Sequence, residues 1–183
     1  MKIPWIGVIM TGKKFLNSVA NGEIDAVQLL LEMLDECRAA YCVIGGLAVN
    51  AYTEPVVSLD LDLVVISDHI ATLREIALGR DMKVQEFEHS VNLSISGSDL
   101  RIQLQSDPRY QEFIERAEYH SVLGYKMSVA CLQDVLRGKI WAYSDETRRQ
   151  SKRQKDLSDI MRLVETHPEL KSDLPPDLAE RID

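Results

Sequence analysis

The chain has 183 residues, a length that favours one domain with at most a small appendage over two full domains. Hydrophobic residues make up 45% and charged residues 27%, which excludes a disordered, collagen-like or low-complexity chain. The 21 Lys and Arg residues against 29 Asp and Glu residues give a net charge of −8, so the chain has little general attraction for nucleic acid or for an anionic membrane. Any phosphate-binding role must therefore be local.

One basic window stands out against this acidic background. Between Arg137 and Lys155 lie seven basic and two acidic residues, a net charge of +5 that leaves −13 for the remainder. Such a run is either a solvated helix face or the cationic side of an anion site. It bears on function only if the fold brings it next to something anionic.

Cysteine usage and the start of the chain indicate the compartment. The three cysteines include no C-x-x-C pair, which favours reduced thiols and a cytoplasmic location over disulfides. Residues 1–10 are apolar, but Gly12, Lys13 and Lys14 follow at once, so this segment is too short for a membrane span and has the wrong charge order for a signal peptide. We expect no membrane partner.

The first half of the chain alternates helices and strands. Apolar residues at helical spacing predict a helix over 23–40, followed by a short β-prone run over 41–44. Gly45-Gly46 closes that run, and a helix over 47–52 comes next. A Leu- and Val-rich segment over 59–66 is typical of a largely buried strand.

Downstream of this strand we expect a helix, three strands that extend one sheet, and then mainly helices. Gly97-Ser98-Asp99 is typical of a turn between the last two of these strands. The expected ranges are a helix over 68–79, strands over 83–88, 91–96 and 100–105, a helix over 108–118, an extended stretch over 125–129, a helix over 132–142, a long last helix with Leu157, Ile160, Met161 and Val164 as its apolar stripe, and a polar tail from Pro175-Pro176.

The sharpest chemical signal is the pair Asp60 and Asp62 inside the strand over 59–66. Side chains of a strand alternate between its faces, so both carboxylates share one face while the apolar residues between them point to the core. At a rise of ~3.3 Å per residue the two lie roughly 7 Å apart, close enough to reach one hard cation or a bridged pair of cations. Alone, a D-x-D pair is more often an ordinary solvent-facing strand face.

Gly45-Gly46 adds an anion-binding element to this carboxylate pair. The two glycines lie at a strand-to-helix junction, where the absence of Cβ atoms lets a phosphate approach backbone N–H groups. By itself a Gly-Gly after a strand is more often a plain turn. The 22 residues from Tyr41 to Asp62 nevertheless combine an anion cradle with a cation site, which is what a nucleoside triphosphate with Mg²⁺ requires.

These motifs resemble the nucleotidyltransferase superfamily of polymerase-β type. Gly45-Gly46 is followed by Ser58 and then by Asp60-Leu61-Asp62, as in that superfamily. The downstream pattern is similar to the branch that contains AbiE-type toxins of type IV toxin–antitoxin systems. It comprises Arg101-Ile102-Gln103-Leu104, Pro108-Arg109-Tyr110, Leu132-Gln133-Asp134-Val135 with Lys139, and Lys155-Asp156-Leu157-Ser158-Asp159-Ile160.

The resemblance implies a fold, a domain organisation and a set of site residues. The fold is α/β (α+β), a mixed sheet flanked by helices with a C-terminal helical segment. The domains are an N-terminal arm over 1–22, a nucleotidyltransferase-like core over 23–125 and a helical segment over 126–183. The implied roles are metal binding by Asp60 and Asp62, with a two-metal Mg²⁺ site possible, and nucleotide binding by Gly45, Gly46, Ser58 and Lys139.

The sequence departs from the family pattern at the third catalytic carboxylate. That position falls on Gln103, a neutral amide that binds Mg²⁺ weakly and cannot take a proton. Asp99 and Asp107 flank the same strand and could supply the missing carboxylate. A second departure is Val56, where this branch often has an Arg. Both departures weaken catalysis more than they weaken nucleotide binding.

Two functions of different class follow. The first is Mg²⁺-dependent transfer of a nucleoside monophosphate from an NTP to an acceptor hydroxyl, on an RNA end, a protein or a small molecule, with a cognate antitoxin as a further partner. The second is a catalytically impaired nucleotidyltransferase-fold protein that serves as a nucleotide-binding or regulatory module. A plain structural protein would bind no nucleotide. Release of pyrophosphate separates the first two.

Overall fold

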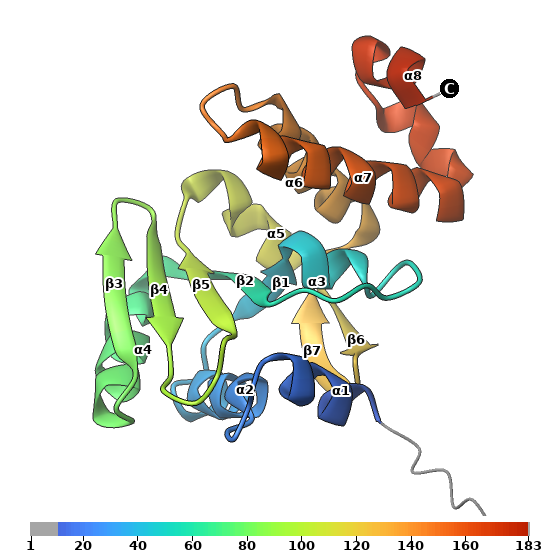
Figure 1. Cartoon of the computed structure of the whole chain (residues 1–183). Coiled ribbons are helices and arrows are strands. Elements are labelled where there is room, and N and C mark those ends of the chain that lie inside the picture. Colours follow the sequence, from blue (N-terminus) through green and yellow to red (C-terminus); the bar gives the residue numbers. More distant parts are fainter. Residues whose placement is uncertain (1–10, 183) are drawn as a thin grey trace, which may run out of the picture.

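The computed structural model describes residues 11–182, and its centre is a seven-stranded mixed sheet (Figure 1). The strand order is β3-β4-β5-β2-β1-β7-β6. The central strand β2 pairs antiparallel with β1 on one side and parallel with β5 on the other. The strands are β1 (Tyr41–Ile44), β2 (Asp60–Val65), β3 (Lys83–Phe87), β4 (Ser90–Ser94), β5 (Arg101–Gln105), β6 (Glu118–Val122) and β7 (Tyr125–Val129).

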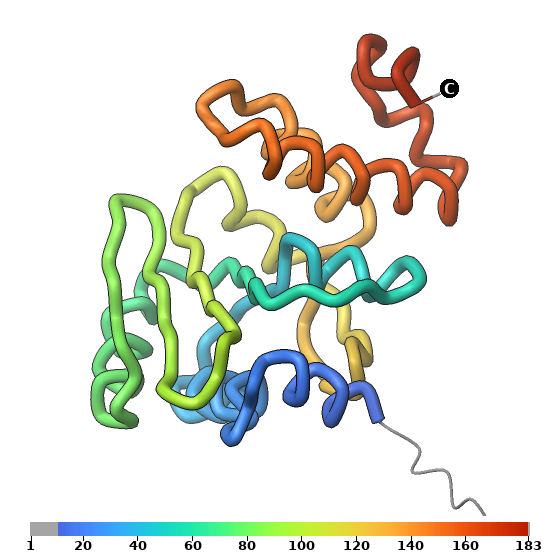
Figure 2. The backbone as a smooth tube through the Cα atoms, in the orientation of Figure 1, coloured from blue at the N-terminus to red at the C-terminus, as the bar shows by residue number. Residues whose placement is uncertain are grey.

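Helices surround this sheet. Helix α2 packs against β7, and helix α4 packs against β3 and β4. The pair α6 and α7 runs side by side over α3 (Figure 2). The helices are α1 (Gly12–Val19), α2 (Ala26–Glu36), α3 (Gly45–Val49), α4 (Ser67–Gly79), α5 (Gln111–Glu115), α6 (Leu132–Ser144), α7 (Gln150–Thr166) and α8 (Pro176–Ile182), with 3₁₀ turns η1 (Pro108–Tyr110) and η2 (Pro168–Asp173).

The core lies between the sheet and these helices. Leu61, Leu63 and Val65 of β2 are at most 1% exposed, and Ile160 and Leu163 of α7 are fully buried. Met161, expected in the apolar stripe of α7, is 38% exposed, because the stripe continues through Leu163 instead. Within 11–182 no helix is long and apolar enough to cross a membrane. The expectation about the apolar segment 1–10 falls outside the described residues.

The expected elements of the sheet are confirmed, whereas two segments differ from their predictions. The helix expected over 108–118 consists of η1 and α5 and stops at Glu115, after which β6 forms the edge of the sheet. The tail after Pro175 contains α8, which Pro176 opens. Proline suits the first helical turn, where its missing N–H would have no partner.

Helix α1 lies before the first predicted segment boundary, and strand β7 spans the second. The arm over 1–22 contains α1, whose Leu16 is 2% exposed, so this helix is packed on the core. The sheet continues past residue 125, because Val43 of β1 pairs with Val129 of β7. The C-terminal helices therefore begin with α6 at Leu132.

Candidate functional site

Asp60 and Asp62 lie on one face of β2, as the alternation predicts. Both are partly exposed, while Leu61 between them is 1% exposed on the opposite face. Burial raises the pKa of the Asp62 carboxyl, and the neighbouring charge of Asp60 raises it further. Three cations oppose this shift: Lys139, Lys155 and Arg148. Two adjacent carboxylates in such a setting favour a bound cation.

The turn from β1 into α3 faces these carboxylates. Gly45 has a φ of +70°, and a Cβ atom there would collide with Oδ2 of Asp62, so only glycine fits. A Cβ atom on Gly46 would lie 3.3 Å from Oγ of Ser58 and 3.9 Å from Nζ of Lys155. The backbone of Gly46 is thus open toward a lysine ammonium, which suits the approach of an anion.

Ser58 braces the start of β2. Its Oγ donates to the backbone oxygen of Asp60 at 3.2 Å and accepts from the backbone N–H of Asp60 at 3.4 Å. Ser58 is 4% exposed and still lines the cleft described below. It therefore holds the start of β2, which carries the two carboxylates, in place beside Gly46.

Gln103 occupies the position directly across from Asp62. In the parallel register of β2 and β5, Asp60 pairs with Arg101 and Asp62 pairs with Gln103. Neither flanking aspartate reaches this place: Oδ2 of Asp99 accepts from Nδ2 of Asn21 at 2.6 Å, and Asp107 binds its own neighbour Arg109. Residues 11–182 contain no group of three or more His, Cys, Asp or Glu side chains able to hold a metal ion.

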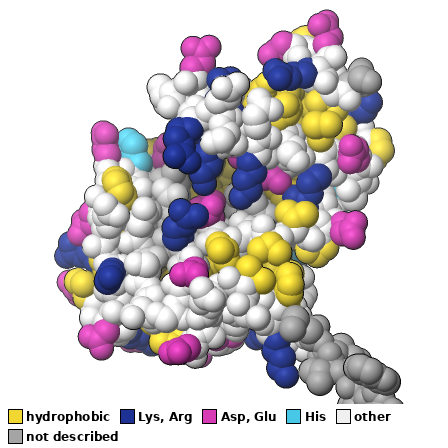
Figure 3. All heavy atoms as spheres, in the orientation of Figure 1, with side chains coloured by type: hydrophobic (Ala, Val, Ile, Leu, Met, Phe, Trp, Pro, Cys, Tyr) yellow, Lys and Arg dark blue, Asp and Glu magenta, His cyan; other side chains and the backbone are white. Residues whose placement is uncertain are grey.

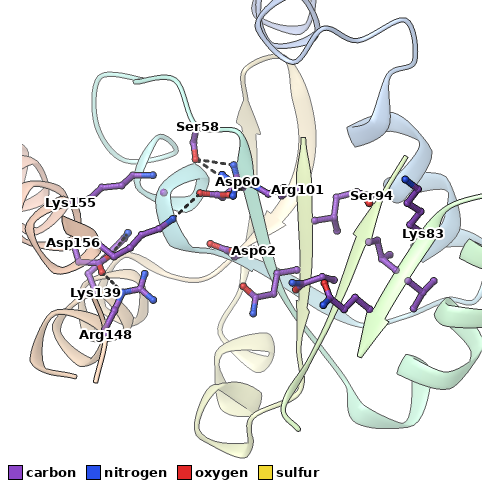
Figure 4. A pocket seen from close by; sticks show the side chains of 18 residues that line it. Ser58, Asp60, Asp62, Lys83, Ser94, Arg101, Lys139, Arg148, Lys155 and Asp156 are labelled. Carbon is purple, nitrogen blue, oxygen red and sulfur yellow. Dashed lines mark hydrogen bonds and ion pairs between the residues drawn. The ribbon is translucent and has the colours of Figure 1, made fainter. Parts of the chain in front are cut away.

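Cations surround the carboxylate pair. Arg101 lies beside Asp60 (Figure 4), with its Nε 3.0 Å from Oδ1 of that side chain. Nζ of Lys152 lies 3.6 Å from Oδ2 of Asp60. Lys155 has no ion-pair partner within the described chain and points toward Gly46. The basic window of the sequence therefore does lie next to an anionic group.

Lys139 has a different environment from the other lysines. Its Nζ lies 2.9 Å from Asp156 and 2.6 Å from Asp159, and all three side chains are at most 8% exposed. Burial would lower the pKa of Lys139, but the two aspartates outweigh it and the pKa is raised. Lys139 lines the cleft, yet its charge is already compensated by the two aspartates. Lys155, which belongs to the family pattern, and Lys152, which the sequence places only in the basic window, are therefore better placed to contact an anion in the cleft.

These groups line a cleft of about 580 Å³ between β2–β5 and α7. Its lining carries six cations and three carboxylates, although the whole chain has a net charge of −8. Figure 3 shows the same concentration of Lys and Arg side chains around Asp and Glu at the centre of this face. The cationic residues are Lys83, Arg101, Lys139, Arg148, Lys152 and Lys155.

A smaller chamber of about 170 Å³ continues behind Asp62 and Gln103. Tyr110 and Phe113 line it, with ring centroids 5.3 Å apart in an edge-to-face arrangement. This side of the carboxylate pair therefore adds an aromatic wall to a chamber that is otherwise lined mainly by polar and charged residues.

The donor set fits one Mg²⁺ ion better than two. Mg²⁺ is commonly held by one or two carboxylates together with substrate phosphates, and Asp60 and Asp62 supply two carboxylates in a cleft with a surplus of cations. The raised pKa of Asp62 is consistent with a group that gains from a nearby cation. Arg101 and Lys152 compete for Asp60, and the amide of Gln103 adds no charge.

Comparison with known proteins identifies the fold. No family model and no curated protein matches the sequence. The structure is similar to that of ANT(2″)-Ia in complex with adenylyl-2″-tobramycin, with a TM-score of 0.58 and 15% identity over 85% of this chain and 94% of that chain. It is also similar to the lincosamide antibiotic adenylyltransferase LnuA, with a TM-score of 0.55 and 10% identity over 78% of this chain and 99% of that chain.

A further neighbour is a nucleotidyltransferase-like protein from Paracoccidioides brasiliensis. Its TM-score is 0.52, and its identity is 18% over 91% of each chain. At such identities these likenesses establish the architecture. The chain has the nucleotidyltransferase fold, a mixed sheet flanked by helices.

Proposed function

We propose that this protein binds a nucleoside triphosphate together with one Mg²⁺ ion and transfers its nucleoside monophosphate to an acceptor hydroxyl. The observation that carries the proposal is the pair Asp60 and Asp62 facing a glycine turn across a cleft with a surplus of cations. The surplus favours a polyanion, and the carboxylate pair favours a divalent cation with it. The nucleotidyltransferase fold supports the same reading.

Each side of the cleft has a distinct part in binding. Asp60 and Asp62 would hold the metal, which when bound neutralises charge on the phosphates. Gly46 presents its backbone to the triphosphate, and Lys152 and Lys155 of α7 add charge from the opposite side. Arg101 and Lys152, which contact Asp60 in this structure, would be released from it if that carboxylate held the metal.

Gln103 makes transfer slow in this proposal. Its amide lies across from Asp62, where a carboxylate could accept the proton of the acceptor hydroxyl. A positioned general base contributes roughly 10²–10⁴-fold to a rate, and this site lacks one. The same observation favours the second candidate, a nucleotide-binding module without turnover.

The narrower resemblance to AbiE-type toxins concerns Lys139 and Lys155-Asp156. Lys139 and Asp156 form a buried ion pair between α6 and α7. A toxin role, a cognate antitoxin and the choice among RNA, protein and small-molecule acceptors remain predictions of that resemblance.

The proposal is tested first by nucleotide binding. Calorimetric titration with ATP should show binding that depends on Mg²⁺ in the wild type and is at least tenfold weaker in Asp62→Asn. Asp99→Asn removes the same charge outside the cleft and serves as the matched control. An ATP affinity that is the same with and without Mg²⁺, and the same in Asp62→Asn as in the wild type, would contradict the metal site.

Release of pyrophosphate from ATP then separates the two candidates. Slow, Mg²⁺-dependent release with an acceptor supports the enzyme. Tight binding without any release across sugar, protein and RNA acceptors supports the binding module.

A further inference from the structure

The open face of β3, β4 and β5 extends the cleft away from the glycine turn. In Figure 4, Lys83 and Ser94 lie on the opposite side of Asp60 from Lys139, Arg148 and Lys155. All of these residues line the same cavity. The carboxylate pair therefore has two flanks, and the triphosphate residues occupy only one of them.

Strand pairing places a row of amides on the second flank. Asp62 pairs with Gln103, Gln103 pairs with Asn92, and Asn92 pairs with Gln85, so the four side chains share one face of the sheet. Oδ1 of Asn92 has no hydrogen-bond partner among the described residues. A row of primary amides offers both donors and acceptors, which suits hydroxyl groups of a ligand.

Two cations flank this amide row. Arg101 contacts Asp60 through its Nε atom, its side chain is 71% exposed, and the residue lines the cleft. Lys83 is exposed, pairs through its backbone with Ser94, and makes no ion pair within the described chain. Both are therefore available to an anionic group of a ligand.

No carboxylate from β3, β4 or β5 lines this flank in the described chain. Glu86 of β3 points to the other face of the sheet, where its Oε1 lies 2.9 Å from Nη1 of Arg74. A polycationic ligand would thus meet Lys83 and Arg101, and the nearest acids are Asp60 and Asp62, which hold the metal in the proposed function. The flank selects against amine-rich acceptors.

We propose that this flank is the acceptor subsite and that it takes a small phosphorylated sugar. The inference rests on the proposed function and names its acceptor. Lys83 and Arg101 bind the phosphate of the sugar, and the amides of Asn92 and Gln85 bind its hydroxyl groups. The amide of Gln103 adjoins the reacting hydroxyl.

The transfer balances without any further reactant. The acceptor oxygen forms a bond to the α-phosphorus of the nucleotide, and the bond from that phosphorus to the bridging oxygen of pyrophosphate breaks. Pyrophosphate leaves with the electron pair of that bond. The hydroxyl proton passes to water, because Gln103 cannot accept it.

Charge distribution favours a small anion over a long RNA. The cleft takes six of the 21 basic residues and three of the 29 acidic ones, so the rest of the chain carries 15 basic against 26 acidic residues. A long RNA must cross this acidic surface, whereas a sugar phosphate fits inside the cationic cleft.

The test measures acceptor binding apart from turnover. The full chain is saturated with Mg²⁺ and α,β-methylene-ATP, an analogue that cannot transfer its nucleotide, and is titrated calorimetrically with ribose 5-phosphate. Ribose, tobramycin and a 12-nucleotide single-stranded RNA are the comparison probes. We expect ribose 5-phosphate to bind at least tenfold more tightly than ribose, and more tightly than the other two.

Lys83 provides the matched variants. Lys83→Gln should weaken binding of ribose 5-phosphate about tenfold or more, since a charge-assisted hydrogen bond is lost, and Lys83→Arg should restore most of it. Lys126→Gln removes an exposed strand lysine outside the cleft and should have no effect.

The outcomes separate this inference from the proposed function. The acceptor assignment is overturned if Lys83→Gln binds ribose 5-phosphate as tightly as the wild type does. It is also overturned if the wild type binds tobramycin or the RNA more tightly than ribose 5-phosphate. Failure of the analogue to bind overturns the proposed function, while ribose 5-phosphate binding that depends on Lys83 would still support the subsite.

Discussion

Replacing Gln103 with Asp tests the account of the site most directly. The side chains at 62 and 103 lie on neighbouring paired strands about 4.8 Å apart, so their carboxylates would be roughly 5 Å apart. At an effective dielectric constant of about 20, two unit charges at that distance repel by about 3 kcal/mol. Rotation of the side chains and uptake of a proton by Asp62 reduce this cost, and we expect a loss of about 2 kcal/mol without metal.

This loss predicts a measurable thermal shift that depends on Mg²⁺. A protein of this size loses about 2–4 °C in Tm per kcal/mol, so Gln103→Asp should melt about 4–8 °C below the wild type in EDTA. Mg²⁺ with ATP should remove most of the difference, because a third carboxylate binds the metal more tightly in the folded state. Calorimetric melting with and without Mg²⁺ measures both effects.

The same variant should gain activity. A carboxylate at 103 can accept the proton of the acceptor hydroxyl, and pyrophosphate release should rise by roughly 10²–10⁴-fold if the rest of the site is intact. Gln103→Asn is the control, because it changes the side chain without adding charge. A Gln103→Asp protein with wild-type Tm in EDTA, no response to Mg²⁺ and unchanged release would refute the assignment of Gln103 to the third position.

Three further predictions concern residues around the cleft. Lys139→Met should cost about 3–5 kcal/mol in urea unfolding, because it leaves two buried aspartates without their shared partner. Gly45→Ala should cost about 1–3 kcal/mol and weaken Mg²⁺ binding, since a Cβ at a φ of +70° collides with Asp62. The hydrogen bonds from Arg109 hold the pKa of Asp107 below its usual range, so its stabilisation is complete above pH ~4 and disappears as pH falls through the lowered pKa. Asp107→Asn should therefore cost about 1 kcal/mol at pH 7, after allowance for screening at the exposed Arg109, and progressively less as the pH falls through the lowered pKa.

Each of these predictions has a contradicting result. Lys126→Met is the control for Lys139→Met, and equal stability of the two proteins would show that the buried ion pairs do not hold α6 on α7. Gly79→Ala adds a Cβ that meets nothing within 4 Å and should be neutral, in contrast to Gly45→Ala. A loss of pyrophosphate release in Asp107→Asn at temperatures where it is folded would show that Asp107 serves the site and not only its own turn.

The central part of the fold could be predicted because its signals are local. Leu61 and Leu63 alternate with the two aspartates, and this period of two fixes both the strand and the face on which the carboxylates lie. Gly45-Gly46 marks the strand-to-helix turn by its composition. Gln103 could be placed across from Asp62 only through the family resemblance, and the register of β2 and β5 agrees with that placement.

Strand β6 could not be predicted because it lies at the sheet edge with little apolar alternation. Only Val122 of this strand is buried. Its turn has positive φ at both Leu123 and Gly124, the geometry that joins two strands in a tight hairpin. Leucine rarely adopts a positive φ, so only Gly124 indicated the turn in the sequence.

The ion-pair partners of the lysines could not be predicted from the sequence either. Lys139 and Lys155 both belong to one basic run, and nothing in their spacing distinguishes a buried cation from one that faces a ligand. The distinction comes from packing: α6 lies on α7, which brings Asp156 and Asp159 against Lys139 and leaves Lys155 directed at Gly46.

The buried ion pairs give the cleft its fixed geometry. Lys139 ties α6 to Asp156 and Asp159 of α7, and Arg162 of α7 donates to Thr53 at 2.8 Å in the loop after α3. Because α7 carries the lysines that face Gly46, these contacts set where the cations stand relative to the glycine turn. In the proposed function, the charge of Lys139 would therefore act on the nucleotide through the position of α7, whereas Lys152 and Lys155 would contact it directly. The one basic window would then supply both the structure of the anion site and its binding groups.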